Sequence, residues 1–129
     1  MAGQTEARFT REHEWAVRNG DEIVIGITSY ASEELGDVVY VEFLDVGVHV
    51  ETMDEFGTVE SVKAVSPLYA PIAGEIVAVN DSLAVEPELV NSSPMSNGWM
   101  IRLRPDDASA IDDLMDSDGY TSFVNELRA

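Results

Sequence analysis

Short runs of β-branched and aromatic residues, separated by frequent turn residues, fill the first two-thirds of this chain. Strands are expected at residues 23–27, 38–43, 56–59 and 74–79, and a late strand at 99–104 should pair back onto the earlier sheet. Val46, Val48 and Val50 alternate with other residues, which predicts one buried face of a further strand. Many short strands with turns between them indicate a small β-sandwich or β-barrel.

Helix is expected in only a few places. A short internal helix should span residues 29–35, with Ser29 as its N-cap and Gly36 as the left-handed residue that ends it. Two further helices should form a C-terminal extension over residues 105–129 that covers an open face or edge of the sheet, with Asp118 as the cap of the second. Their apolar positions are Ile111, Leu114 and Met115 in the first pattern, and Tyr120, Phe123, Val124 and Leu127 in the second.

The charge of the chain is strongly acidic. A length of 129 residues predicts one domain, residues 1–129, yet 25 acidic residues stand against 7 basic ones, for a net charge of −18. Such a surface repels nucleic acid and anionic membranes, so neither is an expected partner. Its self-repulsion weakens the compact state unless salt screens it, which favours a high-salt, halophilic cytoplasm as the setting.

The chain contains no cysteine, which excludes disulfides, thiolate metal sites and cysteine nucleophiles. Residues 1–10 hold no apolar stretch like a signal peptide, and no apolar run approaches transmembrane length. We therefore expect a cytoplasmic monomer. His13 and Trp15 are read as structural residues and no metal site is expected, because His13 has no acidic or histidine partner at ligand spacing.

Lys63 is the only lysine in the chain, although six arginines supply positive charge elsewhere. Arginine cannot replace a primary amine that is to be acylated, since its guanidinium stays protonated and is a poor nucleophile. The lysine lies between two strand-like segments, which places it at or beside a hairpin tip with its amine in solvent. Glu60 lies three residues before Lys63, and Gly74 eleven after it could form a tight turn on a neighbouring hairpin, which would let a modifying enzyme approach.

Several segments together resemble the H proteins of the glycine cleavage system over almost the full length of the chain. They occur in the order and at the spacing of that family. The matching segments are His-Glu-Trp at 13–15, Ile-Gly-Ile-Thr at 25–28, Leu-Gly-Asp-Val-Val at 35–39, Glu-Ser-Val-Lys-Ala at 60–64, Pro-Ile-Ala-Gly-Glu at 71–75, and Asn-Ser-Ser-Pro at 91–94 followed by Gly-Trp-Met at 98–100.

The resemblance implies a barrel-sandwich hybrid fold of the lipoyl and biotinyl domain type and a carrier role without a catalytic centre. In that family the lysine at the position of Lys63 carries lipoic acid through an amide, added by a lipoate-attaching enzyme. The arm accepts an aminomethyl group from glycine at the P protein and presents it to the T protein. It is then reoxidised by the L protein.

The family also shelters its loaded arm in a surface cleft, and Glu14 matches a position that faces this cleft. A carboxylate there could hold the cationic aminomethyl nitrogen. Glu60 and Gly74 are expected to serve recognition by the modifying enzyme. The chain departs from the family at Glu12, where many relatives have a small polar residue, and at Pro67 and Leu68, where polar residues are common. All three are expected to border the cleft.

Two other functions remain open, while the residues beside Lys63 argue against a biotin carrier. Biotin carriers place methionine on both sides of the modified lysine, whereas this chain has Val62 and Ala64. A stand-alone lipoyl relay would serve other lipoate-dependent enzymes with the same attachment site. An unmodified acidic binding module would keep the fold only as a scaffold, and replacing Lys63 by arginine would leave its function intact.

Overall fold

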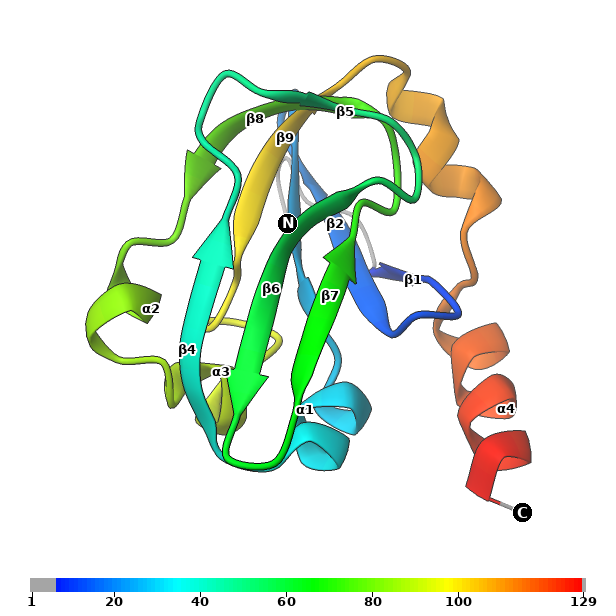
Figure 1. The fold of residues 1–129 in the computed structure, drawn as a ribbon. Helices are drawn as coiled ribbons and strands as arrows, with labels where there is room; N and C mark the ends of the chain where they lie inside the picture. Colours follow the sequence, from blue (N-terminus) through cyan, green and yellow to red (C-terminus); the bar gives the residue numbers. More distant parts are fainter. Residues whose placement is uncertain (1–6, 129) are drawn as a thin grey trace.

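The computed structural model describes residues 7–128, and its strands form two sheets that face each other (Figure 1). One sheet has the strand order β1-β2-β3-β9-β8-β5 and the other the order β4-β6-β7, with every pairing antiparallel. The elements are β1 (Arg8–Phe9), β2 (Glu14–Asn19), β3 (Glu22–Ile27), α1 (Ser29–Leu35), β4 (Val38–Phe43), β5 (His49–Val50), β6 (Glu55–Ser61), β7 (Val65–Tyr69), β8 (Gly74–Val79), α2 (Ser82–Val85), α3 (Leu89–Ser92), β9 (Ile101–Pro105), the 3₁₀-helix η1 (Ala108–Asp113) and α4 (Ser117–Arg128).

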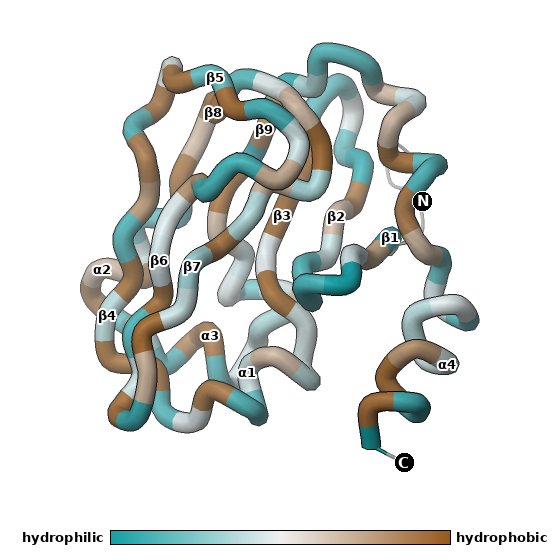
Figure 2. Tube along the Cα trace, turned by 45° about the vertical axis from the view of Figure 1, so that its right-hand side comes forward, coloured by the Kyte–Doolittle hydropathy of each residue, from teal (hydrophilic) through white to brown (hydrophobic). Residues whose placement is uncertain are grey.

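The space between the two sheets is filled by aliphatic side chains and one phenylalanine. Phe56 of β6, Ile25 of β3 and Leu103 of β9 are each fully buried in this core. Polar and apolar residues are interspersed along the strands (Figure 2). In β9 the burial alternates, with Ile101 and Leu103 buried and Arg102 between them partly exposed, because successive side chains point to opposite faces of a sheet. Burying each large aliphatic side chain contributes about 1.5–3 kcal/mol. The predicted mainly β fold, with two packed sheets and C-terminal helices, is confirmed.

The predicted strand through Val46, Val48 and Val50 is wrong except at its end. Val46 and Val48 are 56% and 37% exposed, whereas Val50 is 2% exposed. The chain turns at Gly47, whose φ of 98° lies in the left-handed region, so the strand β5 is confined to His49–Val50. The alternation of valines therefore reflects a turn and not one buried face.

The internal helix α1 has the predicted bounds, but its cap lies one residue earlier. The Oγ1 of Thr28, not of Ser29, accepts a hydrogen bond from the Ala31 amide at the start of the helix. Gly36 follows the helix with φ 78° and ψ −160°, so its φ is positive as expected. Thr28 is 2% exposed, so the hydrogen bond that caps the helix is shielded from water.

The C-terminal segment forms one α-helix and one 3₁₀-helix. The helical prediction fails at Leu114 and Met115, because η1 ends at Asp113 and Met115 instead pairs with Phe9 through two backbone hydrogen bonds. At the start of α4 the side chain of Asp116 accepts a hydrogen bond from the Gly119 amide, so Asp116 takes the capping role predicted for Asp118. The predicted boundary of the extension at residue 105 falls on the last residue of β9.

Helix α4 stands beside β1, the edge strand of the larger sheet (Figure 1). The ring of Tyr120 stacks on that of Phe9, with centroids 4.6 Å apart. The expectation that a C-terminal helix covers a sheet edge is thereby confirmed. Among residues 7–128, no helix has the length and apolar character needed to cross a membrane.

Candidate functional site

Lys63 lies at the tip of the β6–β7 hairpin, at the lower end of the molecule in Figure 1, next to α1. The turn is organised by Ser61, whose Oγ accepts hydrogen bonds from the amides of Lys63 and Ala64 at 3.3 and 3.1 Å. The Ser61 amide donates to the carbonyl of Ala64, which closes the turn. Within residues 7–128 the Lys63 amine forms no hydrogen bond or ion pair, and the side chain is exposed. The amine is therefore free for covalent attachment.

The backbone beside this turn is held by Asn91. Its side-chain oxygen accepts from the Val38 amide at 2.8 Å, and its side-chain nitrogen donates to the carbonyl of Gly36 at 2.8 Å. The intervening residue, Asp37, accepts a hydrogen bond from the Val62 amide through its carbonyl. The segment 36–38 thus connects α3 to the hairpin tip. A Cβ placed on Gly36 would lie 3.6 Å from the Cε of Lys63, so this segment is in contact with the lysine side chain.

The residues predicted to serve recognition by a modifying enzyme lie in different places. Glu60 is exposed on β6, one residue before the turn, and pairs with Val65 across the hairpin. Gly74 is buried at the start of β8 and pairs with Val50 and Pro105, at the end of the molecule opposite the tip (Figure 1). The predicted tight turn at Gly74 is wrong. A Cβ at Gly74 would lie 2.5 Å from the Arg104 carbonyl oxygen, so glycine is required there by close packing of β9.

A cleft of about 340 Å³ opens between the turn before β2, helix α1 and the β6–β7 hairpin. Two of its walls reach the neighbourhood of Lys63. Helix α1 ends at Leu35, next to Gly36, and β7 begins beside the hairpin tip, with Ser66 lining the cleft. The walls combine apolar and acidic side chains. The lining residues are Glu12, His13, Glu14, Ile27, Tyr30, Ala31, Glu34, Leu35, Val59, Ser66, Pro67 and Leu68. Glu12, Pro67 and Leu68 lie at the border of this cleft, as expected; that the cleft shelters an arm stays a prediction.

Glu14 is the buried acid of this cleft, with 1% of its surface exposed. Its Oε1 accepts a hydrogen bond from the Thr10 hydroxyl at 2.6 Å, and its Oε2 accepts one from the Tyr69 amide at 3.3 Å. Burial raises the pKa of Glu14 from its ordinary value of 4.5 to about 7, although these two hydrogen bonds oppose the rise. A nearby cation would reverse the effect of burial, because it would stabilise the carboxylate.

The neighbours of Glu14 in the His-Glu-Trp segment explain why that segment and the Ile-Gly-Ile-Thr segment occur together. Trp15 pairs with Gly26 across β2 and β3, and a Cβ at Gly26 would lie 2.8 Å from atoms of the indole ring. The Trp15 Nε1 donates to the carbonyl of Pro94 at 2.9 Å. Trp15 is a core residue, as predicted, and its packing against a glycine fixes the register in which Glu14 enters the cleft.

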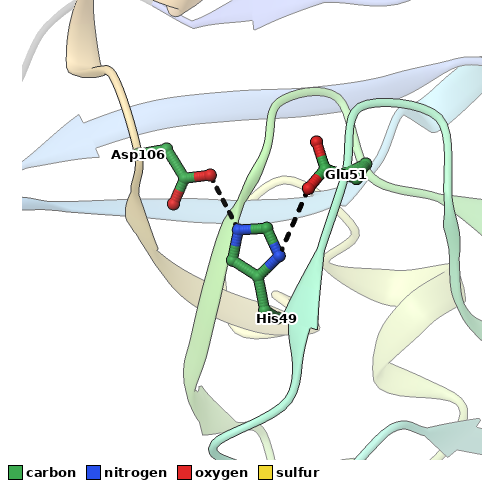
Figure 3. A group of neighbouring side chains, drawn as sticks. All are labelled: His49, Glu51 and Asp106. Carbon is green, nitrogen blue, oxygen red and sulfur yellow. Dashed lines mark hydrogen bonds and ion pairs between the residues drawn. The ribbon is translucent and has the colours of Figure 1, made fainter.

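His49 forms a second cluster with Glu51 and Asp106, shown in Figure 3, at the surface and away from the cleft. Its Nε2 lies 2.7 Å from Asp106 Oδ2 and its Nδ1 lies 3.4 Å from Glu51 Oε2. Both ring nitrogens face carboxylates, which is the arrangement of a charged imidazolium, since a neutral ring has a single N–H to donate. The hydrogen bond to Asp106 is the main cause that raises the pKa of His49.

The sequence matches known proteins over most of its length. A model of the glycine cleavage H-protein family matches residues 7–127. The chain belongs to the glycine cleavage H-protein family. It is 52% identical to the glycine cleavage system H protein of Anaeromyxobacter sp. (strain K), with 94% of each chain covered, and 48% identical to that of Bacillus cereus (strain AH187), with 98% of this chain and 99% of the other covered.

Family membership extends to the three-dimensional structure. The crystal structure of a glycine cleavage system H protein from Mycobacterium marinum superimposes with a TM-score of 0.82 at 31% identity, and the match covers 100% of both chains. The two-sheet fold and its C-terminal helices are therefore features shared with a solved H protein.

Three residues that contribute to the site were given no role by sequence reasoning. Ser61 organises the lysine turn, and its place two residues before Lys63 in a turn-forming segment was an available signal. Asn91 supports the tip from 28 residues further along the chain, and Tyr120 contacts His13 with a sequence separation of 107. Nothing in the local pattern around Asn91 or Tyr120 indicates these long-range contacts.

Proposed function

We propose that this chain is the lipoyl carrier of a glycine cleavage system, with the lipoyl group attached to the Nζ of Lys63. The observation that carries the proposal is the position of the only lysine of the chain at a hairpin tip, exposed, beside an acidic and apolar cleft. When attached, the group supplies a dithiol that accepts the aminomethyl unit of glycine and releases it again. The partners are the P, T and L proteins and a lipoate-attaching enzyme.

The cleft has the composition that such an arm requires. Leu35 and Pro67 provide apolar surface for the hydrocarbon part of the arm, whereas Leu68 is almost fully buried and belongs to the wall itself. Glu14 supplies a carboxyl group to pair with a cationic amine through a charge-assisted hydrogen bond. The apolar walls limit the access of water to a group that would otherwise be hydrolysed.

The chain itself performs attachment, presentation and protection, and leaves the chemistry to the arm and to its partner enzymes. Glu60 lies beside the lysine on the exposed face of β6 and serves recognition by the attaching enzyme. Gly74 serves the same enzyme only indirectly, by keeping β8 close to β9. We further propose a cytoplasmic monomer, with residues 1–129 acting as one carrier domain.

Replacing Lys63 by arginine tests this function. Lys63→Arg keeps the charge at the tip but removes the acylatable amine, so the variant should fold normally and fail to support glycine cleavage with purified P, T and L proteins. Glu42→Gln, a substitution on the exposed side of β4, is a control that should retain full activity. Full activity of Lys63→Arg would contradict the carrier role and favour an unmodified binding module.

A further inference from the structure

The hydroxyl of Tyr120, on the C-terminal helix α4, contacts two other parts of the molecule at once. It lies 2.8 Å from the Nδ1 of His13 and 2.7 Å from the Oγ1 of Thr28. Tyr120 is 8% exposed, and its ring is fixed by stacking on Phe9 with 4.6 Å between centroids. The position of the hydroxyl is therefore set by the packing of α4 on the β1 edge.

The two partners of this hydroxyl belong to two different walls of the arm cleft. His13 lines the cleft from the turn before β2. Thr28 caps α1, and four residues of α1 line the cleft from the other side, ending with Leu35. The Thr28 amide already donates to the His13 carbonyl at 2.9 Å, and the Tyr120 hydroxyl adds a link between the side chains of the same two residues.

His13 needs such a restraint because its backbone is strained. Its φ of 70° lies in the left-handed region, which non-glycine residues adopt at a cost of about 1–3 kcal/mol when the surroundings impose it. The ring is packed between Tyr30 and Phe123, with centroid distances of 4.7 and 5.7 Å. Aromatic packing determines the position of the His13 ring, and the hydrogen bond to Tyr120 determines which way its Nδ1 points.

We propose that Tyr120 is a positioning residue of the arm cleft: its hydroxyl fixes the tautomer of His13 and ties that residue to the first turn of α1. In a neutral imidazole one nitrogen donates and the other accepts. Thr28 Oγ1 already accepts from the Ala31 amide, and among residues 7–128 its only other partner is the Tyr120 hydroxyl, so Thr28 donates its proton to Tyr120. Tyr120 then donates to Nδ1, which leaves the proton of the neutral His13 ring on Nε2. The consequence for arm protection rests on the proposed carrier function, but the effect on His13 does not.

The protonation of the groups around His13 agrees with this arrangement. Burial lowers the pKa of His13, and the charges of Glu12 and Glu34 oppose this only in part, so the ring is neutral near pH 7. Burial also raises the pKa of the Tyr120 hydroxyl, which keeps its proton. The His13 ring therefore carries one N–H proton, and the Tyr120 hydroxyl carries its own proton.

The substitution Tyr120→Phe tests the proposal, because it removes the hydroxyl and keeps the ring that stacks on Phe9. In ¹⁵N-labelled protein at pH 8, the two ring nitrogens of wild-type His13 should have the widely separated shifts of a single tautomer. In Tyr120→Phe the shifts should move towards each other, since the loss of one net hydrogen bond changes a tautomer ratio by about fivefold. Tyr40→Phe, the same change at an exposed residue of β4, should leave the shifts of His13 unaltered.

Arm protection is measured on the same proteins after enzymatic lipoylation. The reduced arm is loaded with formaldehyde and ammonia: the thiol sulfur and the ammonia nitrogen both bond to the formaldehyde carbon, and one water leaves. The loaded group should be lost about fivefold faster from Tyr120→Phe and from Thr28→Val than from wild type. Thr28→Ser keeps the hydroxyl and should match wild type.

Unchanged ¹⁵N shifts of His13 in Tyr120→Phe would overturn the inference, whether or not the arm is protected. Wild-type rates of loss in both Tyr120→Phe and Thr28→Val would overturn it as well. If the wild-type protein lost the group as fast as free aminomethyl dihydrolipoamide, the proposed carrier function would be contradicted instead, and the shifts of His13 would still decide whether Tyr120 positions it.

Discussion

At the scale of single residues, the site depends on what burial does to Glu14. Its carboxyl group lies in the cleft with both oxygens hydrogen-bonded, and its pKa is raised to about 7. The fold therefore favours the protonated form of an acid that the proposed function would use as a carboxylate. A cationic group on the arm would restore the charged form, so binding of the loaded arm and ionisation of Glu14 should be coupled.

The substitution Glu14→Gln tests the energetic side of this statement. An acid whose pKa is raised on folding stabilises the protein below its unfolded pKa and loses that contribution as the pH rises through its folded pKa. Because the pKa of Glu14 is raised from 4.5 to about 7, the free energy of unfolding of the wild-type protein should fall by about 3 kcal/mol, relative to that of Glu14→Gln, between pH 4.5 and a pH above 7.

Urea denaturation of both proteins from pH 4 to 9 measures this difference, and its pH dependence is the quantity of interest. Glu42→Gln changes an exposed glutamate on β4 and is the matched control, with the wild-type pH dependence expected. A difference between wild type and Glu14→Gln that stayed constant across this range would show that Glu14 titrates as an ordinary glutamate.

At the scale of elements, Lys63 is presented by a hairpin whose tip is fastened to the segment 36–38. Asn91 of α3 provides the two hydrogen bonds that hold this segment, and Val62 adds one from the turn itself. Segments that are far apart in sequence but belong to the family pattern meet here. Their shared purpose in the fold is to keep a mobile side chain on a rigid base.

The substitution Asn91→Ala should loosen this base. It leaves the Val38 amide and the Gly36 carbonyl without their side-chain partner, at a cost of about 1–3 kcal/mol in the free energy of unfolding. Hydrogen exchange at Val38 should accelerate more than exchange in the β2–β3 pair. Asn97→Ala, at an exposed asparagine, is the control. Equal stability of the two variants would show that the Asn91 contacts do not support the tip.

A surface ion pair lies at the other end of the larger sheet. His49 of β5 contacts Asp106, the residue after β9. Both side chains are exposed, so burial has little effect on the strength of this contact. The raised pKa of His49 means that the pair contributes to stability below the ordinary pKa of histidine and that this contribution is lost as the pH rises through the raised value. This pairing joins β5 to the sheet by a side chain as well as by its two-residue ladder with β8.

At the scale of the whole molecule, the net charge of −18 acts on a small fold. The ion pairs present among residues 7–128 involve exposed side chains, and such pairs are each worth about 0–1 kcal/mol. They cannot offset the mutual repulsion of 25 acidic residues. We therefore expect the stability of the compact state to depend on screening by salt.

The midpoint of thermal unfolding should rise when potassium chloride is increased from about 0.1 M, where the Debye length is about 10 Å, to about 1 M, where it is about 3 Å. A variant in which Glu86, Glu88 and Asp112, all exposed or partly exposed, are replaced by their amides should show a weaker rise. Stability that does not depend on salt would contradict the expectation of a high-salt setting.

How far the sequence predicts this molecule depends on the range of the interactions concerned. The strands β3, β4, β6 and β8 were predictable because alternation and turn residues are local, and the lysine tip follows from a strand on either side of Lys63. The alternation of Val46, Val48 and Val50 led to a wrong strand prediction, because the same spacing also occurs in a turn. The contacts Tyr120–His13 and His49–Asp106 were not predictable, since they join residues 107 and 57 positions apart.

The intact mass of the protein purified from its native host shows whether Lys63 carries a lipoyl group. We expect a mass increase of one lipoyl group, located on Lys63 by peptide sequencing. A biotin-sized increase at Lys63 would assign the protein to carboxylase chemistry. An unmodified Lys63, in cells that synthesise lipoate, would contradict the carrier role.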